Sequence, residues 1–369
     1  MEKQIKWLKV KELLEKRISE IRPADREKEN EALERLRQQA RPAGSLGILE
    51  PLSARLAAVK ETLDVKLENK IIITCAGDHG VVEEGVSLFP SEVTTQMVYN
   101  FVNGGASVNV LGKHAGAEVI AADLGVNHDF EKELPIFHKK VGYGTENFTK
   151  GPAMSYEQAL KSVLNGIEII DELVGRGPVD MLATGDMGIG NTTPSTAVIA
   201  AFSGIEVEKL TGHGTGIDDK ALLNKIEVIK KGIAVNKPDR NDPLDVLAKV
   251  GGFEIGGLAG LVIGAAVHKI PVVCDGLIST AGALIACELA PLAKEYLFAG
   301  HRSVEAGHKF MHERLGLTPI LDLNFRLGEG TGAALAMELL DASTRILADI
   351  KTFEEVAIQD QNTNSKFTG

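Results

Sequence analysis

The start of the chain carries apolar residues at spacings of three and four, the period of an amphipathic helix. These residues are Trp7, Val10, Leu14, Ile18 and Ile21. Pro23 ends the pattern, Asp25 is a suitable cap for a second helix, and residues 48–63 again have helical composition. Because β-rich runs are scarce in this part of the chain, the pattern predicts a small helical unit.

From residue 70 onward, short β-rich apolar runs alternate with longer segments of helical composition. The runs are 71–75, 118–122, 179–183, 271–274, 296–299 and 319–323. Such alternation predicts a parallel sheet with helices on both faces, and mostly apolar strands are typical of a sheet buried on both sides. We therefore expect an α/β fold.

Polar residues and glycines follow each of these runs. They occupy residues 77–80, 123–125, 185–188, 275–276, 300–303 and 324–329. A single loop of this kind can simply form a turn. Its repetition after most of the runs favours a ligand site at the carboxyl edge of the sheet, where open parallel sheets bind their ligands.

Composition narrows the class of protein. The chain has 369 residues, enough for two or three domains, and 44% of them are hydrophobic, which argues against a largely disordered chain. Asp and Glu number 51 against 40 Lys and Arg, for a net charge of −11. This charge argues against electrostatic binding of nucleic acid or anionic membranes, so any anion must be bound locally.

Three features predict a cytoplasmic protein. Cysteine is scarce and odd in number, with Cys75, Cys274 and Cys287 forming no CxxC pair or disulfide framework. The apolar run 255–267 falls short of the roughly 20 residues that a membrane span needs. The N-terminus is charged where a signal peptide would be apolar.

The segment 185–194, Gly-Asp-Met-Gly-Ile-Gly-Asn-Thr-Thr-Pro, is the richest in candidate chemistry. Its glycines allow close backbone approach to a ligand, Thr192 and Thr193 offer hydroxyls, and a helix follows whose free N–H groups suit a phosphate. It matches neither the P-loop nor the GxGxxG pattern. On the residues alone, an ordinary glycine-rich turn remains an equal alternative.

Two further loops contain candidate phosphate ligands. Residues 212–218 are glycine-rich, and Lys225 follows about two helical turns later, where it either contacts a phosphate or is solvated on a helix face. Ser303 lies at an expected helix start, where it either binds a ligand or only caps the helix.

Glu329 is the sharpest single candidate. It lies between Gly328 and Gly330, after a predicted strand and before an apolar helix from Ala333 to about Leu347. Burial there would raise the pKa of its carboxyl and make it a better base near neutral pH, while the helix amino end would oppose that shift. The alternative is a glutamate that only favours the helix dipole.

Metal and nucleophile patterns are weaker. His79, His213, His301 and His308 are dispersed, without an HExxH motif, and no GxSxG elbow is present. The three cysteines have the setting of core residues.

Taken together, these segments resemble the nicotinate-nucleotide–dimethylbenzimidazole phosphoribosyltransferase family, which makes the lower-ligand nucleotide of cobalamin. The matching segments occur in order through most of the chain. They are residues 41–47, 77–81, 85–87, 92–94, 104–106, 185–193, 251–255, 300–303 and 327–332.

The resemblance implies a Rossmann-like parallel sheet flanked by helices, with a small helical bundle built from both chain ends. We expect residues 1–64 with 343–369 to form the helical domain and residues 65–342 to form the α/β domain. The resemblance also implies a homodimer that needs no metal and no cofactor.

The implied reaction moves phosphoribose from nicotinate mononucleotide to 5,6-dimethylbenzimidazole, giving α-ribazole 5′-phosphate and nicotinate with inversion at the anomeric carbon. Glu329 matches the family's base. Phosphate and ribose contacts match Asp186, Gly188, Ile189, Gly190, Asn191, Thr192, Lys225 and Ser303. The base pocket matches Ser87, Phe89, Gln96, Met97 and Leu327. Many relatives carry Glu where this chain has Asp186, which makes that ribose contact one methylene shorter.

Three other functions stay open at this point. The first is hydrolysis of nicotinate mononucleotide, with water as the acceptor. The second is a nucleotide-binding regulatory module without turnover. The third is a metal-dependent hydrolase that uses Asp78, His79 and His213.

Overall fold

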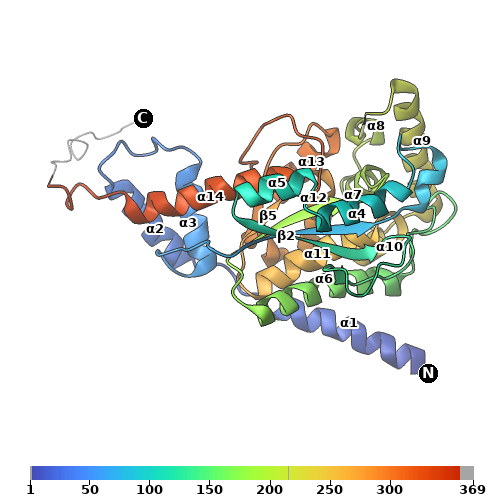
Figure 1. Cartoon of the computed structure of the whole chain (residues 1–369), viewed down its shortest axis with the longest axis horizontal. Helices are drawn as coiled ribbons and strands as arrows, with labels where there is room; N and C mark the ends of the chain where they lie inside the picture. The colour runs from blue at the N-terminus through green and yellow to red at the C-terminus, as the bar shows by residue number, and fades with distance from the viewer. Residues whose placement is uncertain (1, 215, 358–369) are drawn as a thin grey trace. The chain divides into compact units, whose positions relative to one another are not determined.

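Six parallel strands form one sheet in the order β3-β2-β1-β4-β5-β6 (Figure 1). The strands are β1 (Lys70–Gly77), β2 (Ala117–Gly125), β3 (Phe137–His138), β4 (Met181–Met187), β5 (Val272–Cys274) and β6 (Leu297–Ala299). The computed structural model describes residues 2–214 and 216–357, and only the backbone of residues 2–9. Every residue of β1 and β4 is buried, as expected for central strands covered on both faces. The structure confirms the α/β fold.

Helices join the strands and cover the sheet. Between β1 and β4 they are α4 (Glu92–Val102), α5 (Ser107–His114) and α6 (Tyr156–Arg176). Between β4 and β6 they are α7 (Thr192–Ser203), α8 (Val207–Leu210), α9 (Asp219–Asn236), α10 (Pro243–Val250), α11 (Phe253–Val267) and α12 (Leu277–Leu289). After β6 come α13 (Ala306–Leu315) and α14 (Thr331–Asp349), and short 3₁₀ helices span Gly80–Glu84 and Pro291–Tyr296. In Figure 1, α4 and α5 lie on one side of the sheet and α6 and α11 on the other.

The apolar run 255–267 lies within α11, which packs against α6 and contacts β1, β2 and β4. The two helices approach closely because both have glycines at their contact. A Cβ on Gly166 would lie 2.1 Å from the carbonyl oxygen of Gly257. None of the helices in the described part of the chain is long and apolar enough to cross a membrane.

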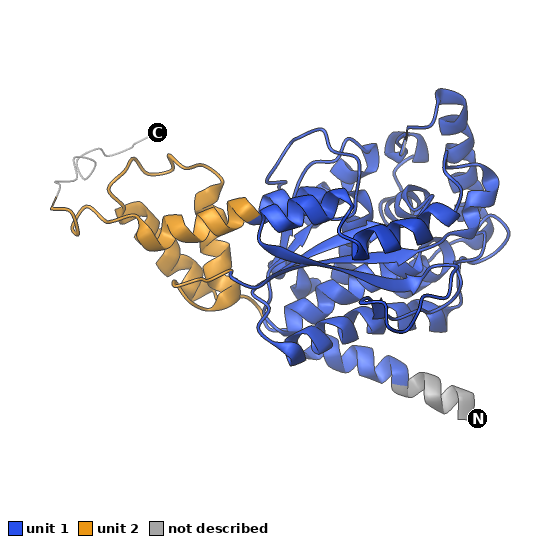
Figure 2. Ribbon diagram, in the orientation of Figure 1, with its two compact units in different colours: residues 1–22, 68–337 blue, residues 23–67, 338–369 orange. Residues whose placement is uncertain are grey.

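The chain divides into two compact units (Figure 2). The larger comprises Met1–Arg22 with Glu68–Met337, and the smaller Pro23–Leu67 with Glu338–Gly369. This division differs from the expected one at the first helix, α1 (Glu2–Glu20), which belongs to the larger unit because it packs on α6 and α11. Residues 358–369, which the sequence assigned to the helical domain, lie outside the described residues.

The smaller unit contains α2 (Arg26–Gln38), α3 (Leu49–Lys60) and the later part of α14. Asp25 is confirmed as the cap of α2, because its side chain accepts hydrogen bonds from the backbone N–H groups of Glu27 and Lys28. Ala32 and Leu36 of α2 are buried, and α2 packs against α3.

The prediction of a strand at 319–323 is wrong. Ile320 and Leu321 donate backbone hydrogen bonds to Ala299 and Gly300, at 2.9 and 3.1 Å, so the segment begins to extend the sheet beside β6. Only one parallel bridge forms, between His301 and Leu321. The backbone then turns at Asn324, whose φ is 57°, and pairing stops. The sixth strand is instead the two-residue β3, too short for any sequence pattern to reveal.

Candidate active site

A cavity of about 300 Å³ is lined by residues that follow β1 and β4 and precede α14. The candidates from the sequence that line it are Ser87, Phe89, Met97, Asp186, Gly188, Ile189, Gly190, Asn191, Thr192, Leu327 and Glu329. Val86, Val93 and Met187 also line it; they belong to the matching segments 85–87, 92–94 and 185–193 but were not among the expected site residues. The carboxyl edge of the sheet therefore brings together residues from segments far apart in the chain.

Glu329 lies in this cavity with an unusual backbone. Its φ is 67°, and the flanking Gly328 and Gly330 have φ values of 87° and 104°. The left-handed region costs a non-glycine residue roughly 1–2 kcal/mol. Backbone contacts hold it there: the Glu329 N–H donates to the Asp186 carbonyl over 3.2 Å, and the Thr74 hydroxyl donates to the Glu329 carbonyl over 2.9 Å.

Gly185 is required for this arrangement. A Cβ at position 185 would lie only 2.0 Å from the carbonyl oxygen of Glu329. Any side chain there would push the Glu329 loop off the end of β4, so the first glycine of the 185–194 segment serves loop packing.

The carboxyl group of Glu329 is buried, with 6% of the residue exposed. Burial raises the pKa of this carboxyl above its usual range. The hydrogen bond from the Val108 N–H, at 3.4 Å, acts in the opposite direction, and the charge of Asp275 adds to the rise. Burial and the raised pKa give Glu329 the setting of a general base.

Asp186 supplies a second buried carboxyl to the same cavity. Its Oδ2 accepts a hydrogen bond from Asn191 Nδ2 over 3.0 Å, and its Oδ1 has no partner within the protein. Burial, followed by the charge of Asp275, raises the pKa of Asp186 well above its usual range. Oδ1 is therefore available to a ligand that donates a hydrogen bond or carries positive charge.

The loop after Asp186 is shaped to meet an anion. Gly190 has a φ of 83°, and the Ile189 N–H donates to Thr94 Oγ1 over 3.1 Å, which fixes the loop against α4. The helix α7 begins directly afterwards at Thr192, which lines the cavity. Helix amino ends favour anions because their free N–H groups can donate hydrogen bonds and the positive end of the helix dipole lies there.

Lys225 lies behind Thr192 and does not line the cavity. Its Nζ donates to Thr192 Oγ1 over 2.8 Å and to the Gly212 carbonyl over 3.2 Å. The residue is fully buried, and burial lowers its pKa to about 8, with the Glu305 charge acting in the opposite direction. The solvated position on a helix face that the sequence left open is thereby excluded.

Ser303 and Gln96 also lie away from the cavity walls. The Ser303 N–H donates to His308 Nδ1 over 3.0 Å, and its hydroxyl accepts from the Glu305 N–H over 3.3 Å, just before α13. Glu305 in turn accepts from the Gly214 N–H over 2.9 Å, which links this loop to the one near Lys225. Gln96 is exposed on α4.

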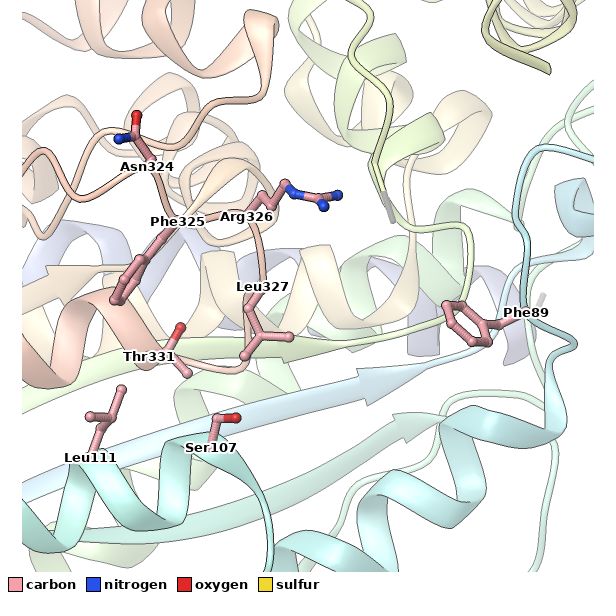
Figure 3. Close-up of a pocket in the computed structure, with 8 residues that line it drawn as sticks. All are labelled: Phe89, Ser107, Leu111, Asn324, Phe325, Arg326, Leu327 and Thr331. Carbon is pink, nitrogen blue, oxygen red and sulfur yellow. The ribbon is translucent and has the colours of Figure 1, made fainter. Parts of the chain in front are cut away.

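A second cavity of about 590 Å³ adjoins the first (Figure 3). Phe89 and Leu327 line both cavities, and they are 48% and 55% exposed. In Figure 3, Leu327 comes from the loop that also carries Phe325 and Arg326, whereas Phe89 comes from a separate segment of the chain. These apolar side chains can cover a flat aromatic ring between them.

Sequence reasoning gave no role to two buried acidic groups. Asp275 accepts hydrogen bonds from three backbone N–H groups at the start of α14, and Glu254 Oε1 lies 2.9 Å from His79 Nε2. The run 275–276 did place Asp275 at the correct edge, and Glu254 lies in the matching segment 251–255, directly before the apolar run 255–267, but it received no role. Within the described residues, no group of three or more His, Cys, Asp or Glu side chains could hold a metal ion.

Comparison with known proteins identifies the class. A family model described as phosphoribosyltransferase matches residues 21–358. A relative from Geobacter sp. (strain M21), named nicotinate-nucleotide–dimethylbenzimidazole phosphoribosyltransferase, is 54% identical over 347 residues, covering 94% of this chain and 99% of the relative. A protein of the same name from Geotalea uraniireducens (strain Rf4) is 56% identical over 348 residues, with the same two coverages.

The fold agrees with these relatives. The crystal structure of the enzyme of that name from Thermus thermophilus has a TM-score of 0.86 at 41% identity, covering 91% of this chain and 99% of that one. Fold, site and family model together define a phosphoribosyltransferase. The chain belongs to the nicotinate-nucleotide–dimethylbenzimidazole phosphoribosyltransferase family.

Proposed function

We propose that this enzyme transfers phosphoribose from nicotinate mononucleotide to 5,6-dimethylbenzimidazole, with Glu329 as general base. The observation that carries the proposal is the meeting of two buried carboxyls, Glu329 and Asp186, with a glycine-rich loop and helix amino end in one cavity. The names of the relatives supply the substrates.

The phosphate of nicotinate mononucleotide binds at the loop 188–192 and the amino end of α7 in this proposal. A protein with a net charge of −11 needs local compensation for an anionic substrate. Lys225 provides it, because its Nζ is joined to Thr192 Oγ1 and so lies next to the loop. Ser303 belongs to the neighbouring loop that Glu305 connects to Gly214.

The acceptor ring binds against the apolar part of the cavity. Phe89, Val93, Met97 and Leu327 line this part, and Ser87 adds a hydroxyl beside them. Gln96 stays part of the proposed pocket, although it is exposed on α4 and does not line the cavity.

The proposed chemistry is one direct displacement. The C–N bond between the anomeric carbon and the nicotinate ring breaks, and its electron pair neutralises the pyridinium, so the leaving group needs no acid. One nitrogen of dimethylbenzimidazole forms the new bond from the opposite face, which inverts the configuration to α. The proton on its other nitrogen becomes acidic and passes to Glu329, a contribution typically on the order of 10²–10⁴ in rate.

Asp186 complements the base. Its unpartnered Oδ1 suits a ribose hydroxyl, and its negative charge would stabilise the positive charge that develops at the ribosyl carbon. The reaction is redox-neutral, and no step of it calls for a cofactor.

Product analysis tests this function. The protein is mixed with nicotinate mononucleotide and a panel of bases in the presence of EDTA, and products are identified by mass spectrometry and NMR. We expect nicotinate and α-ribazole 5′-phosphate in equal amounts. Nicotinate release without any added base would show a hydrolase, binding without turnover would show a regulatory module, and loss of activity only with EDTA would show a metal-dependent enzyme.

The proposal includes a homodimer. Light scattering of the purified protein measures its mass in solution, and a mass of one chain would contradict this part of the proposal without affecting the reaction.

A further inference from the structure

Asp275, directly after β5, is joined to the loop that carries Glu329. Its Oδ1 accepts hydrogen bonds from the N–H groups of Gly332 and Ala333, at 2.7 and 2.9 Å. Its Oδ2 accepts from the N–H of Gly330, at 3.2 Å. The residue is fully buried, and its other close polar neighbour is His301 Nε2, 3.5 Å from Oδ1.

These three bonds act on a backbone that needs support. Gly328, Glu329 and Gly330 all have positive φ, and the Glu329 conformation is intrinsically unfavourable. Asp186 and Thr74 hold the peptide groups of Glu329 itself. Asp275 holds the next N–H along the chain, so the loop is fixed on both sides of the catalytic side chain.

We infer that Asp275 is a positioning residue for phosphoribosyl transfer, which holds the Glu329 carboxyl in place through the Gly330 N–H. The inference rests on the proposed role of Glu329 as base. Asp275 does not line either cavity, so its effect passes through the loop and not through contact with substrate.

Asp275 also affects the charge state of the base. Among the described residues, Asp275 at the end of β5 raises the pKa of Glu329, Glu329 in turn raises the pKa of Asp186 on β4, and His301 lies beside Asp275. From α5, the Val108 N–H donates to Glu329 Oε2. The negative charge of Asp275 raises the pKa of Glu329, in addition to the larger effect of burial.

Asp275→Asn removes the hydrogen bond to Gly330 and the negative charge, but keeps the capping of α14. The amide oxygen can still accept from Gly332 and Ala333, but the amide nitrogen cannot accept from Gly330. We expect kcat to fall about 10- to 100-fold, as for the loss of one hydrogen bond to a charged group, while the KM for nicotinate mononucleotide stays within about threefold. The acidic limb of the kcat profile should move to lower pH, because the variant loses the negative charge that raises the pKa of Glu329.

Asp242→Asn is the matched control. Asp242 is also a helix-capping aspartate: its Oδ1 accepts from the N–H groups of Leu244 and Asp245 at the start of α10, and the residue lies outside both cavities. It should leave kcat and the pH profile unchanged. An unchanged profile in Asp275→Asn as well would overturn the inference, since a purely structural defect does not move the titration of Glu329.

A double variant distinguishes this inference from the proposed function. If Asp275 acts through Glu329, Asp275→Asn should cause no further loss in the Glu329→Gln background. If the double variant loses activity by the product of the two single losses, the inference is overturned and the base role is left intact. Near-normal activity of Glu329→Gln alone would overturn the base role, and the inference with it.

Binding of nicotinate mononucleotide, measured by titration, reports whether each variant is folded at the site. If Asp275→Asn does not fold, Asp275→Ser replaces it. The shorter hydroxyl can cap the helix but leaves Gly330 without a partner, so the same loss of kcat and the same shift in pH are expected. Normal kcat in a folded Asp275→Ser variant would contradict the inference.

Discussion

The backbone N–H of Glu329 donates a hydrogen bond to the backbone carbonyl of Asp186 over 3.2 Å. This bond joins the loop before α14 to the end of β4 and brings two buried carboxyls into one cavity. The close approach depends on Gly185, the residue before Asp186, which has no side chain to obstruct the Glu329 carbonyl. This one backbone contact therefore holds both carboxyls in the cavity, where burial raises the pKa of each.

Glu329→Gln preserves the shape of the side chain and removes the proposed base. We expect kcat to fall about 10²-fold or more, because proton transfer contributes on the order of 10²–10⁴ in rate. Nicotinate mononucleotide should bind with nearly unchanged affinity. Steady-state nicotinate release and ligand titration measure the two quantities.

Glu92→Gln is the control for that change, since Glu92 is exposed at the start of α4 and does not line either cavity. It should behave as wild type. Activity of Glu329→Gln within a few fold of the control would remove Glu329 from the base role.

The pH dependence of kcat should show an acidic limb that belongs to Glu329. A base works only when ionised, and burial raises the pKa of this carboxyl. Activity should therefore fall about tenfold per pH unit below a midpoint that lies above the ordinary glutamate pKa of about 4.3. A profile that stays flat down to pH 4 in folded enzyme would contradict this assignment.

Lys225→Ala should weaken the phosphorylated substrate and leave the affinity for free dimethylbenzimidazole nearly unchanged. Lys225 Nζ contacts Thr192 and does not line the cavity, so its charge acts on the phosphate from behind the loop. A direct charge-assisted hydrogen bond contributes roughly 1.5–3 kcal/mol, so we expect the affinity to fall by at most about 10- to 150-fold. Isothermal titration with each ligand measures the effect, and Lys220→Ala, exposed on the same helix α9, is the control. Equal losses for both ligands would indicate a structural role.

The lowered pKa of Lys225 adds a pH test. A lysine with a pKa of about 8 loses its charge as pH rises through that value, so affinity for nicotinate mononucleotide should be greatest below pH 8 and decline above it. The Lys225→Ala variant should lack this decline.

Asp186→Asn should stabilise the fold at neutral pH. Because the folded protein raises the pKa of Asp186 through burial and through nearby carboxylates, the ionised form favours unfolding. An amide relieves this, and we expect the free energy of unfolding to rise by about 0.5–2 kcal/mol. The gain in the free energy of unfolding is complete at pH values above the pKa of Asp186 in the folded protein and shrinks as pH falls through that pKa. It disappears below the ordinary aspartate pKa of about 3.9.

Urea unfolding at several pH values measures this difference. Asp219→Asn is the control, because the Asp219 side chain is 98% exposed and carries no burial cost. A loss of stability in Asp186→Asn at neutral pH would show that the carboxylate is favourably solvated in the folded protein.

Much of the fold was predictable because burial leaves a local trace. Strands covered on both faces must be apolar. Apolar runs in the sequence correspond to β1, β2, β4, β5 and β6. The run 319–323 has the same character and yet forms a single bridge, because the turn at Asn324 ends its pairing with β6. β3 left no trace, since two residues cannot show an alternating pattern.

The candidate site was predictable to a similar degree. The segment 185–194 and Glu329 attracted attention because glycine and polar residues follow apolar strands, and both segments line the same cavity. Asp275 was placed at the correct edge without a role, because its partners are backbone N–H groups from another segment, and these have no signature in the sequence.

The sequence by itself determined the parallel α/β sheet, the edge of the sheet at which the candidate cavity lies, and most of the residues that line that cavity. These features depend on the order of apolar and polar residues, which is a local property of the chain. Only the tertiary structure decided which carboxyls share one buried space, that Lys225 lies behind Thr192, and that Asp275 supports the Glu329 loop. Desolvation and hydrogen bonding act between atoms that folding brings together, so their effects on pKa and loop geometry are set by the packed structure.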